Sequence, residues 1–378
     1  MKFLHLSDLH LGKRVNEYSM LEDQEYILNE ILSVIESERP EAVIIAGDVY
    51  DKPVPPAEAV MLFDGFLTAL SERKIKVFII SGNHDSAERM SFGARLMEDS
   101  GIYISRAYEG KISPVALADE YGSVNLYMLP FIKPANIRRF TEEAVESYTD
   151  AVRVAIKDSA PDFSERNILI THQFVTGASR TDSEEITVGG TDNVDASVFE
   201  GFDYVALGHI HRPQSSVSEF IRYCGSPLKY SFSEAKDEKS VTVIEMSEKG
   251  NLKVRCIPLK PLRDMVELKG KYNDLMQKSF YENTSYQEDY THITLTDEED
   301  VIDAIGRLRT VYHNLMKLDY DNQRTRSSLA IDGAIEVEMK SPMELFSDFY
   351  ELQNNSPMSD EQKAFMEELI EKIWEGER

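Results

Sequence analysis

The sequence of 378 residues has few cysteines and a single tryptophan. Its two cysteines, Cys224 in "RYCGSP" and Cys256 in "KVRCIPL", stand in separate segments without the spacing of a metal-binding motif. Two such residues do not form a disulfide framework of the kind that secreted domains use. We therefore expect two reduced thiols.

Long apolar runs are also absent. No segment approaches the roughly 18 uninterrupted apolar residues that a membrane span needs. The opening "MKFLHLSDLHLG" acquires Asp8 too early for the apolar region of a signal peptide. Low-complexity tracts and internal repeats are missing as well, which favours a chain that is folded throughout. Together these absences predict a cytoplasmic protein.

Basic residues are scarce, because 41 lysines and arginines stand against 67 acidic residues, for a net charge of -26. A field of this sign repels polyanions at long range. The charge therefore does not suggest a nucleic-acid-binding protein. Any such binding has to come from a local basic surface, a bound metal or a basic partner.

The first part of the chain alternates strand-like and helix-like segments. The strand "FLHLSD" is followed by a helix over Leu21 to Glu38, the strand "AVIIAGD", a helix near Ala57 to Arg73 and the strand "KVFIISGNHD". Strands this apolar are typical of sheets that are covered on both faces. Further strands are predicted at "NLYMLPF", "NILITHQF", "DYVALGH", "SVTVIEM" and "LKVRCIPL". The pattern predicts an α/β fold that is richer in strands than a simple doubly wound sheet.

The pattern changes near Pro261, and we expect three parts, at residues 1–260, 261–335 and 336–378. The middle part is predicted to be a small α/β domain. Its strands are expected at "DMVELKG", "THITLT" and "LMKLDY", and its helices at "YNDLMQKS" and over Val301 to Tyr312. The last part contains two helices, whose starts are marked by capping boxes at Ser341 and Ser359. Their apolar faces either pack on the parent domain or dock on a partner.

Polar side chains gather directly after the predicted strands. In α/β sheets, ligands bind at the carboxyl ends of strands, so residues that are far apart in sequence can converge there. Each residue alone has an ordinary structural explanation, such as a turn or a cap. If all of these residues had only such structural roles, buried charges would be left without partners. The strand ends carry Asp8, His10, Asp48, Asp51, Asn83, His84, Asp85, His172, His209 and His211.

The ligand chemistry of this set points to two divalent cations. Its oxygen and nitrogen donors, without a thiolate, suit manganese, iron or zinc. The set is too large for one ion, but two ions about 3.5 to 4 Å apart could share a bridging carboxylate, as in phosphatases and nucleases. Phosphoester hydrolysis is the reaction that such a site favours. The seven donors are Asp8, His10, Asp48, Asn83, His172, His209 and His211.

The motifs Asp-x-His, Gly-Asp-x-x-Asp, Gly-Asn-His-Asp, a later His and Gly-His-x-His, in this order, resemble the signature of the calcineurin-like metallophosphoesterases. The stretches "GDVYDKPVPP", "VGGTDNVDASVFEGFDYVALGHIHRPQ" and "CGSPLKYSFSE" are similar to the SbcD family of bacterial nuclease subunits, which are related to the Mre nucleases. The resemblance implies an αββα sandwich with a small α/β capping domain and C-terminal helices.

The same resemblance implies a role for each site residue. One ion is held by Asp8, His10, Asp48 and His211, and the other by Asp48, Asn83, His172 and His209, with Asp48 as the bridge. His84 is not a ligand but faces the scissile phosphate, where it can protonate the leaving oxygen. Asp51 orients His84.

The resemblance to this family also implies binding partners. Family members work with a coiled-coil ATPase of the SbcC type and cut double-stranded DNA ends and hairpins in DNA repair and recombination, usually with manganese. They dimerise through the nuclease domain, which gives a heterotetramer. Their C-terminal helices dock on the ATPase, and here the docking residues would be Leu345, Phe349, Phe365, Leu369 and Trp374.

Two other functions stay open at this point. A phosphatase or cyclic-nucleotide phosphodiesterase with the same metal core would act on small substrates, which the acidic charge mildly favours. The long segment near Val188 to Phe199 and the extra C-terminal parts argue against it. A non-enzymatic scaffold is the third possibility, which the complete ligand set disfavours.

Overall fold

The computed structural model describes residues 1–184 and 192–322, together with residues 325, 343, 346, 347, 349, 350, 358, 359, 362–366, 369 and 370. The chain divides into two units, Met1–Val266 and Glu267–Arg378. The three-part division expected from the sequence stays a prediction.

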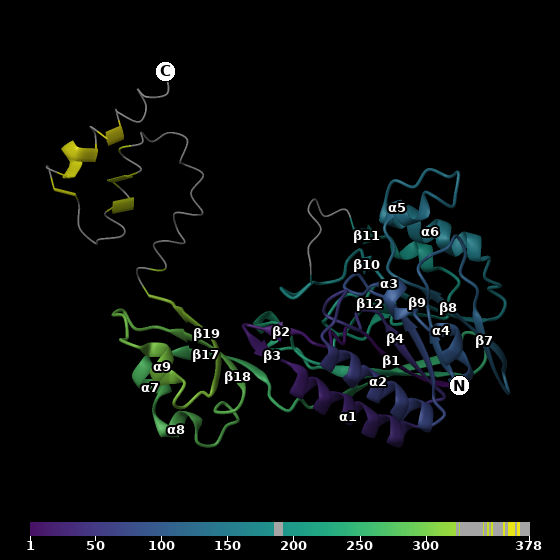
Figure 1. The fold of residues 1–378 in the computed structure, drawn as a ribbon, viewed down its shortest axis with the longest axis horizontal. Coiled ribbons are helices and arrows are strands. Elements are labelled where there is room, and N and C mark those ends of the chain that lie inside the picture. Colours follow the sequence, from purple (N-terminus) through teal and green to yellow (C-terminus); the bar gives the residue numbers. More distant parts are fainter. Residues whose placement is uncertain are drawn as a thin grey trace. The chain divides into compact units, whose positions relative to one another are not determined.

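The first sheet of the first unit has the strand order β16-β15-β1-β4-β5-β6 (Figure 1). Strands β1, β4, β5 and β6 run parallel, and β15 joins β1 in the antiparallel direction, followed by β16. The predicted apolar runs form these strands, and all five residues of β4 are buried. The strands are β1 (Lys2–Leu6), β4 (Ala42–Ala46), β5 (Lys76–Ile80), β6 (Ile102–Ile104), β15 (Ser240–Met246) and β16 (Leu252–Pro258).

The second sheet has the order β13-β14-β12-β9-β8-β7. Its central strands β8, β9, β12 and β14 are parallel, and short antiparallel strands close both edges. The strands are β7 (Val115–Asp119), β8 (Gly122–Leu129), β9 (Arg166–His172), β12 (Tyr204–Gly208), β13 (Gln214–Ser215) and β14 (Ile221–Tyr223). The unit thus contains two parallel-rich sheets, where the sequence pattern alone could not say how the strands would be divided.

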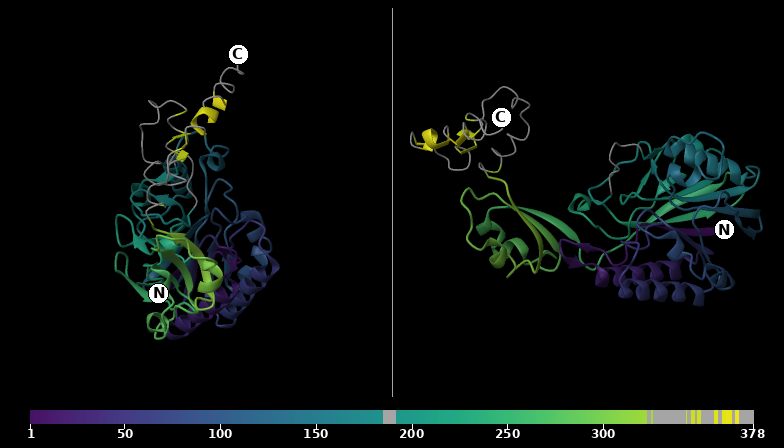
Figure 2. Two further views of the ribbon diagram at one scale, coloured as in Figure 1. Left: turned by 90° about the vertical axis from the view of Figure 1, so that its left-hand side faces the viewer. Right: turned by 45° about the horizontal axis from the view of Figure 1, so that its top comes forward.

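The two sheets pack face to face through an apolar cluster. Phe3, Ile44 and Phe78 of the first sheet meet Leu126 and Ile170 of the second within one buried core. Because side chains alternate along a strand, the neighbouring residues of the first sheet face away from this core. Helices α1 (Leu21–Glu38) and α2 (Ala57–Glu72) lie side by side and cover that outer face (Figure 1 and Figure 2).

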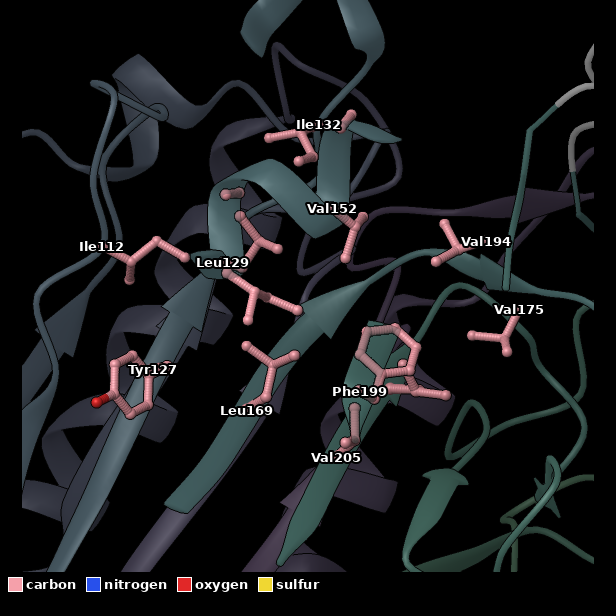
Figure 3. Close-up of a cluster of buried hydrophobic side chains, with 14 of the residues drawn as sticks. Ile112, Tyr127, Leu129, Ile132, Val152, Leu169, Val175, Val194, Phe199 and Val205 are labelled. Carbon is pink, nitrogen blue, oxygen red and sulfur yellow. The ribbon is translucent and has the colours of Figure 1, made fainter. Parts of the chain in front are cut away.

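The outer face of the second sheet is covered by α5 (Pro134–Ile137), α6 (Tyr148–Ser159) and the short 3-10 helix η2 (Ala196–Phe199). Leu129, Leu169 and Val205, from three adjacent strands, project toward Val152 of α6 and Phe199 of η2 (Figure 3). The layers of the unit are therefore helix, sheet, sheet and helix. This is the αββα sandwich that the resemblance implied.

Shorter elements connect these layers. They are β2 (Arg14–Val15), β3 (Tyr18–Ser19), α3 (Ala87–Met90), α4 (Ala94–Met97), β10 (Phe174–Val175), β11 (Asn193–Val194) and the 3-10 helices η1 (Glu98–Ser100) and η3 (Phe232–Glu234). Both cysteines of the described chain are free thiols, Cys224 buried and Cys256 exposed. None of the described helices is long and apolar enough to cross a membrane.

The second unit is built on a three-stranded sheet with the order β17-β18-β19. Its elements are β17 (Met265–Gly270), α7 (Tyr272–Leu275), α8 (Lys278–Tyr281), β18 (Tyr290–Leu295), α9 (Ala304–Leu308) and β19 (Asn314–Tyr320). The predicted strands are confirmed, whereas the first predicted helix forms as two short helices. Near the C-terminus, the Ser359 N–H donates to the side chain of Gln362 (2.9 Å) and the Gln362 N–H to Ser359 Oγ (3.3 Å). The capping box at Ser359 is confirmed, and Ser341 lies outside the described residues.

Candidate metal centre

The predicted ligands follow the carboxyl ends of strands from both sheets. In the first sheet they come after β1, β4 and β5, and in the second they come at or after the ends of β9 and β12. Because the two sheets are stacked with these ends together, residues up to 201 positions apart form direct contacts. The residues brought together in this way are Asp8, His10, Asp48, Asn83, His84, His172, His209 and His211.

One part of the cluster joins Asp8, His10 and His211, whose ligand atoms lie within 4.8 Å of one another. The Nε2 atoms of the two histidines face each other at 3.0 Å. Imidazole nitrogens are common ligands of divalent cations, and two that face each other this closely could share one ion.

The other part of the cluster joins Asn83, His172 and His209. Oδ1 of Asn83 lies 3.0 Å from His172 Nε2 and 2.9 Å from His209 Nδ1. His209 and His211 thus face different groups of donors, as the predicted division between two ions requires. Oδ2 of Asp48 lies 3.2 Å from His172 Nε2 and 3.7 Å from His10 Nε2, a position suited to a bridging carboxylate.

The backbone at four of these positions adopts left-handed conformations. Asp8, His10, Asp48 and His209 have φ angles of 53°, 44°, 49° and 97°. Such conformations cost on the order of 1–3 kcal/mol each at residues other than glycine and gather at functional sites. Hydrogen bonds hold three of them at 3.0 Å. The Asp8 N–H donates to Gly47 O, the His10 N–H to Asp48 O and the His209 N–H to Asp8 Oδ1.

Two glycines allow the strand ends to approach one another. A Cβ on Gly208 would lie 2.0 Å from the Ala46 carbonyl oxygen, which belongs to the other sheet. A Cβ on Gly82 would lie 2.1 Å from Asp48 Oδ1. Side chains at these positions would push apart the segments that carry the ligands. The same close approach lets His172 Nδ1 bond to Ala46 O at 2.8 Å, which leaves Nε2 to face Asp48.

The buried charges of the site perturb one another. Although burial alone lowers it, the pKa of His172 is raised to about 9 by the Asp48 carboxylate. Burial lowers the pKa of His10 to about 4 and that of His209 well below its usual value. Burial also raises the pKa of Asp48, but His172 and its neighbours outweigh that effect and hold it well below its usual range. The Asp48 side chain therefore stays ionised and the His172 ring stays protonated. A cation bound here would take the Asp48 carboxylate as a ligand and would displace the proton from His172.

The donor set fits divalent metal ions. It combines two carboxylates, one amide oxygen and four imidazoles, all from described residues that are buried or half-buried. Nδ1 of His10 finds no hydrogen-bond partner among the described residues, and Nε2 of the same ring lies 3.0 Å from His211 Nε2 and 3.7 Å from Asp48 Oδ2. A bound cation would give these facing nitrogens a partner. Mixed oxygen and nitrogen donors are those of manganese, iron and zinc sites.

His84 lies at the edge of the cluster and is more exposed than the predicted histidine ligands. Its backbone N–H donates to Asp48 Oδ1 at 2.9 Å, and its ring Nδ1 bonds to the backbone carbonyl of Asp51 at 3.0 Å. The contact of His84 with Asp51 is thus made through the backbone of Asp51, and the role of Asp51 in orienting His84 stays a prediction. The carboxylate of Asp51 instead pairs with Lys13 Nζ at 2.7 Å and lies 3.6 Å from His10 Nδ1.

Asp51→Asn should leave His84 in place, because the backbone carbonyl that holds its ring is unchanged. We expect a rate of phosphoester hydrolysis within about threefold of the wild type at saturating metal, and a modest loss of affinity for the ion beside His10, since a hydrogen bond or charge contact of this kind contributes on the order of 1 kcal/mol. The hydrolysis rate and the metal affinity, measured in parallel, check both. If Asp51→Asn bound metal as the wild type does but lost as much rate as a His84 variant, the Asp51 carboxylate would act on His84.

Three further residues support the site in roles that the sequence did not predict. Asp85 accepts hydrogen bonds from the backbone N–H groups of Val49 (3.1 Å), Tyr50 (2.9 Å) and Gly82 (2.9 Å), and so ties the loop after β4 to the loop after β5. Burial raises the pKa of Asp85 to about 6. The "GNHD" motif contained this residue, but its role needed the tertiary structure.

The other two are Gln24 and Tyr230, which hold the strained segment around His10. Nε2 of Gln24 donates to His10 O at 2.7 Å and to the Tyr230 hydroxyl at 3.1 Å, and that hydroxyl donates to Leu9 O at 2.5 Å. The Tyr230 ring also packs edge-on against His10 and His211. A glutamine on the buried face of a helix gives no sequence signal for such a role.

The predicted docking residues near the C-terminus are placed only in part. Phe349, Phe365 and Leu369 are 56%, 65% and 39% exposed. Leu345 and Trp374 lie outside the described residues. One of these three residues, Phe365, lines an apolar groove, together with Phe346, Tyr350, Met358, Gln362 and Met366.

Two segments of the chain match known protein families. A family model described as calcineurin-like phosphoesterase matches residues 1–213, and a model described as type 5 capsule protein repressor C-terminal domain matches residues 261–354. Among curated proteins, the chain is 32% identical over 385 residues to a Staphylococcus epidermidis protein named as the SbcD component of the nuclease SbcCD, with both chains covered completely.

Among solved structures, a dimetal phosphatase from Danio rerio matches with a TM-score of 0.41 and 10% identity, over 69% of this chain and 98% of its own. The phosphoesterase Yfce from E. coli matches with a TM-score of 0.28 and 14% identity, over 69% of this chain and 100% of its own.

Proposed function

Because this chain belongs to the calcineurin-like phosphoesterases, and among them to the family of SbcD nuclease subunits, we propose that it is a manganese-dependent DNA nuclease that works in complex with a coiled-coil ATPase. It is a phosphodiester hydrolase with a site for divalent metal ions. The observation that carries the proposal is the convergence of seven oxygen and nitrogen donors, with His84 beside them, at the joined ends of two sheets.

Two ions would occupy this site. Asp8, His10, Asp48 and His211 would hold the first, and Asp48, Asn83, His172 and His209 the second. When bound, divalent cations lower the pKa of water and offset the negative charge of a phosphodiester. The two carboxylates would neutralise only half of the charge of two such ions, so the site keeps a net attraction for a phosphate.

His84 would act on the leaving oxygen. Its Nδ1 donates to the Asp51 carbonyl at 3.0 Å, which fixes the ring and leaves Nε2 as the nitrogen that can carry a proton to the substrate. A positioned general acid of this kind contributes about 10² to 10⁴ in rate. His84 therefore holds and transfers a proton, whereas the predicted ligands bind ions.

The net charge of -26 requires that DNA be held mainly elsewhere. A basic surface on the ATPase partner would supply the long-range attraction that this chain lacks. The relative from Staphylococcus epidermidis is named as part of the SbcCD complex, which supports such an assembly. Exposed Phe349, Phe365 and Leu369 supply apolar anchors for helix docking, and we propose that Leu345 and Trp374 belong to the same surface.

We also propose a homodimer that forms through the nuclease domain. Met61 on α2 is 73% exposed, and Phe92 and Leu96, around α3 and α4, are 88% and 83% exposed. Large apolar side chains that are this exposed are available for contact with a second copy of the chain. Two nuclease chains with two ATPase chains would form a heterotetramer.

The test is purification with bound partners, followed by a cleavage assay. We expect a large ATPase to co-purify with the tagged chain, and the complex to cut linear duplex and hairpin DNA with Mn²⁺ but not with a chelator. Small phosphodiesters and phosphomonoesters serve as the comparison substrates. Fast turnover of those small substrates without cleavage of DNA would replace the nuclease with a phosphatase or cyclic-nucleotide phosphodiesterase.

Raising the pH from about 6 to about 8 should strengthen Mn²⁺ binding at the ion site that contains His172. Its pKa, which burial lowers but Asp48 raises to about 9, keeps the ring protonated across this range. A cation that takes Nε2 must displace that proton, so the apparent affinity should rise by up to about tenfold per pH unit and level off above a pH of about 9.

His10 does not add to the pH dependence of Mn²⁺ affinity between about pH 6 and 8, because burial lowers its pKa to about 4 and the ring is already neutral. Calorimetric titrations at several pH values, in buffers of different ionisation enthalpy, measure both the affinity and the proton released. An affinity that does not change with pH in this range would contradict the assignment of His172 as a ligand.

A further inference from the structure

Three polar groups of His211 are held by side chains from other segments. Its backbone N–H donates to Glu184 Oε1 at 2.7 Å, and its backbone carbonyl accepts a hydrogen bond from Lys239 Nζ at 2.8 Å. Its ring Nδ1 lies 2.7 Å from Ser183 Oγ. The remaining nitrogen, Nε2, faces His10 Nε2 at 3.0 Å. The surroundings of His211 therefore direct one atom of the residue into the metal centre.

The serine connects His211 to a buried ion pair. Ser183 Oγ donates to Glu234 Oε1 at 2.5 Å, and Glu234 Oε2 accepts from Lys239 Nζ at 2.5 Å. Lys239 uses its three ammonium hydrogens on Glu234, His211 O and Ser226 Oγ. Glu234 is fully buried and Lys239 is 5% exposed. Burying such a pair costs desolvation energy and contributes little to stability, so stability alone does not account for it.

The direction of the hydrogen bonds follows from the ion pair. Glu234 bonds to an ammonium group, so its carboxylate is ionised and can only accept hydrogen bonds. Ser183 has one hydroxyl hydrogen, which therefore points to Glu234. The Ser183 oxygen must then accept from His211, and Nδ1 of His211 carries the hydrogen. The lone pair of this ring is left on Nε2.

We propose that Glu234, acting through Ser183 and braced by Lys239, is a positioning residue that keeps His211 in the Nδ1–H tautomer with its Nε2 lone pair aimed into the first ion site. The inference rests on the proposed function, because it takes His211 to be a ligand. Partners of this kind, one bond beyond the ligand, change metal affinity by about 10- to 100-fold. His209 is not part of this network, since its Nδ1 faces Asn83 at 2.9 Å, so the effect should fall on one ion of the two.

Ser183→Ala tests the proposal, because it removes the hydroxyl and leaves the ion pair of Glu234 and Lys239 in place. Calorimetric titration with Mn²⁺ should show that one ion binds about 10- to 100-fold more weakly while the other keeps its affinity. Ser183→Thr, which restores a hydroxyl, should recover the first ion. Without metal, long-range ¹⁵N NMR of the histidine rings should find His211 as the Nδ1–H tautomer in the wild type and as a mixture in Ser183→Ala.

The matched control is Asp237→Asn. Asp237 lies in the same segment and pairs with Arg212 Nε at 2.9 Å, next to His211 in sequence but outside the network. We expect both ions to bind to this variant with wild-type affinity. Glu234→Gln should show the same selective loss as Ser183→Ala. This variant leaves Lys239 with an uncompensated buried charge. If Glu234→Gln fails to fold for that reason, Ser183→Ala alone decides the question.

The inference is overturned if Ser183→Ala binds both ions as tightly as the wild type, if it weakens both equally, or if His211 carries its hydrogen on Nε2 in the wild-type protein. The proposed function fails in a different way, namely if the wild-type complex binds fewer than two Mn²⁺ ions or cuts no DNA. The two failures are therefore distinguished by the wild-type titration and assay alone.

Discussion

His84→Gln should lower DNA cleavage by about 10² to 10⁴ while leaving Mn²⁺ binding intact. The glutamine cannot donate a proton to the leaving oxygen, but none of the seven predicted ligands is removed. The backbone N–H of residue 84, which bonds to Asp48 Oδ1 at 2.9 Å, also remains. Single-turnover cleavage of hairpin DNA at saturating Mn²⁺, together with a metal titration, measures the two effects separately.

The control for this variant is His313→Gln. The side chain of His313 is 51% exposed, lies in the second unit and pairs with Glu288 at 3.0 Å. We expect full activity from it. If His84→Gln cut DNA at the wild-type rate, His84 would have no role in the mechanism. If the variant instead lost bound metal, His84 would be a metal ligand.

Asp48→Asn should have the largest effect on metal binding, because this carboxylate lies between the two groups of donors. Its Oδ2 is 3.2 Å from His172 and 3.7 Å from His10. Removal of a shared ligand should weaken both ions by more than about 100-fold, beyond the range found for residues outside the ligand set. Cleavage of DNA should then fall below detection at Mn²⁺ concentrations that saturate the wild type.

The D48N variant should also change His172 in the absence of metal. The Asp48 carboxylate is what raises the pKa of His172 to about 9 against the effect of burial, so the neutral amide should let that pKa fall. Histidine NMR titration checks this result independently of activity. Asp64→Asn, which removes an exposed carboxylate from α2, controls for the loss of one negative charge. If only one ion were lost from D48N, Asp48 would be a ligand to a single ion and not a bridge.

Much of the fold could be predicted because local patterns carry it. The helix expected over Leu21–Glu38 forms with those bounds, and the run Ala42–Ala46 is a strand buried on both faces. Periodicity and apolar content act over a few neighbouring residues, so they are visible in one segment at a time. The small domain was predicted less accurately, since the segment expected to form one helix forms two, Tyr272–Leu275 and Lys278–Tyr281.

The candidate ligands could likewise be found from their residue types and their places after strands. Their grouping could not, because His209 and His211 are two residues apart and alternate positions of a strand would face the same way. The backbone leaves β12 at Gly208, and His209 adopts a φ of 97°. That turn sends one histidine toward Asn83 and the other toward His10.

By itself the sequence determined which chemistry this protein carries: carboxylates, an amide and imidazoles placed after apolar strands. Only the tertiary structure decided how those groups are held, with His84 on the Asp51 carbonyl and His211 on Ser183 and Glu234. The physical reason is distance along the chain. Ser183 and Glu234 are 51 residues apart, and their contact depends on how the two sheets and their loops pack, which no local pattern encodes.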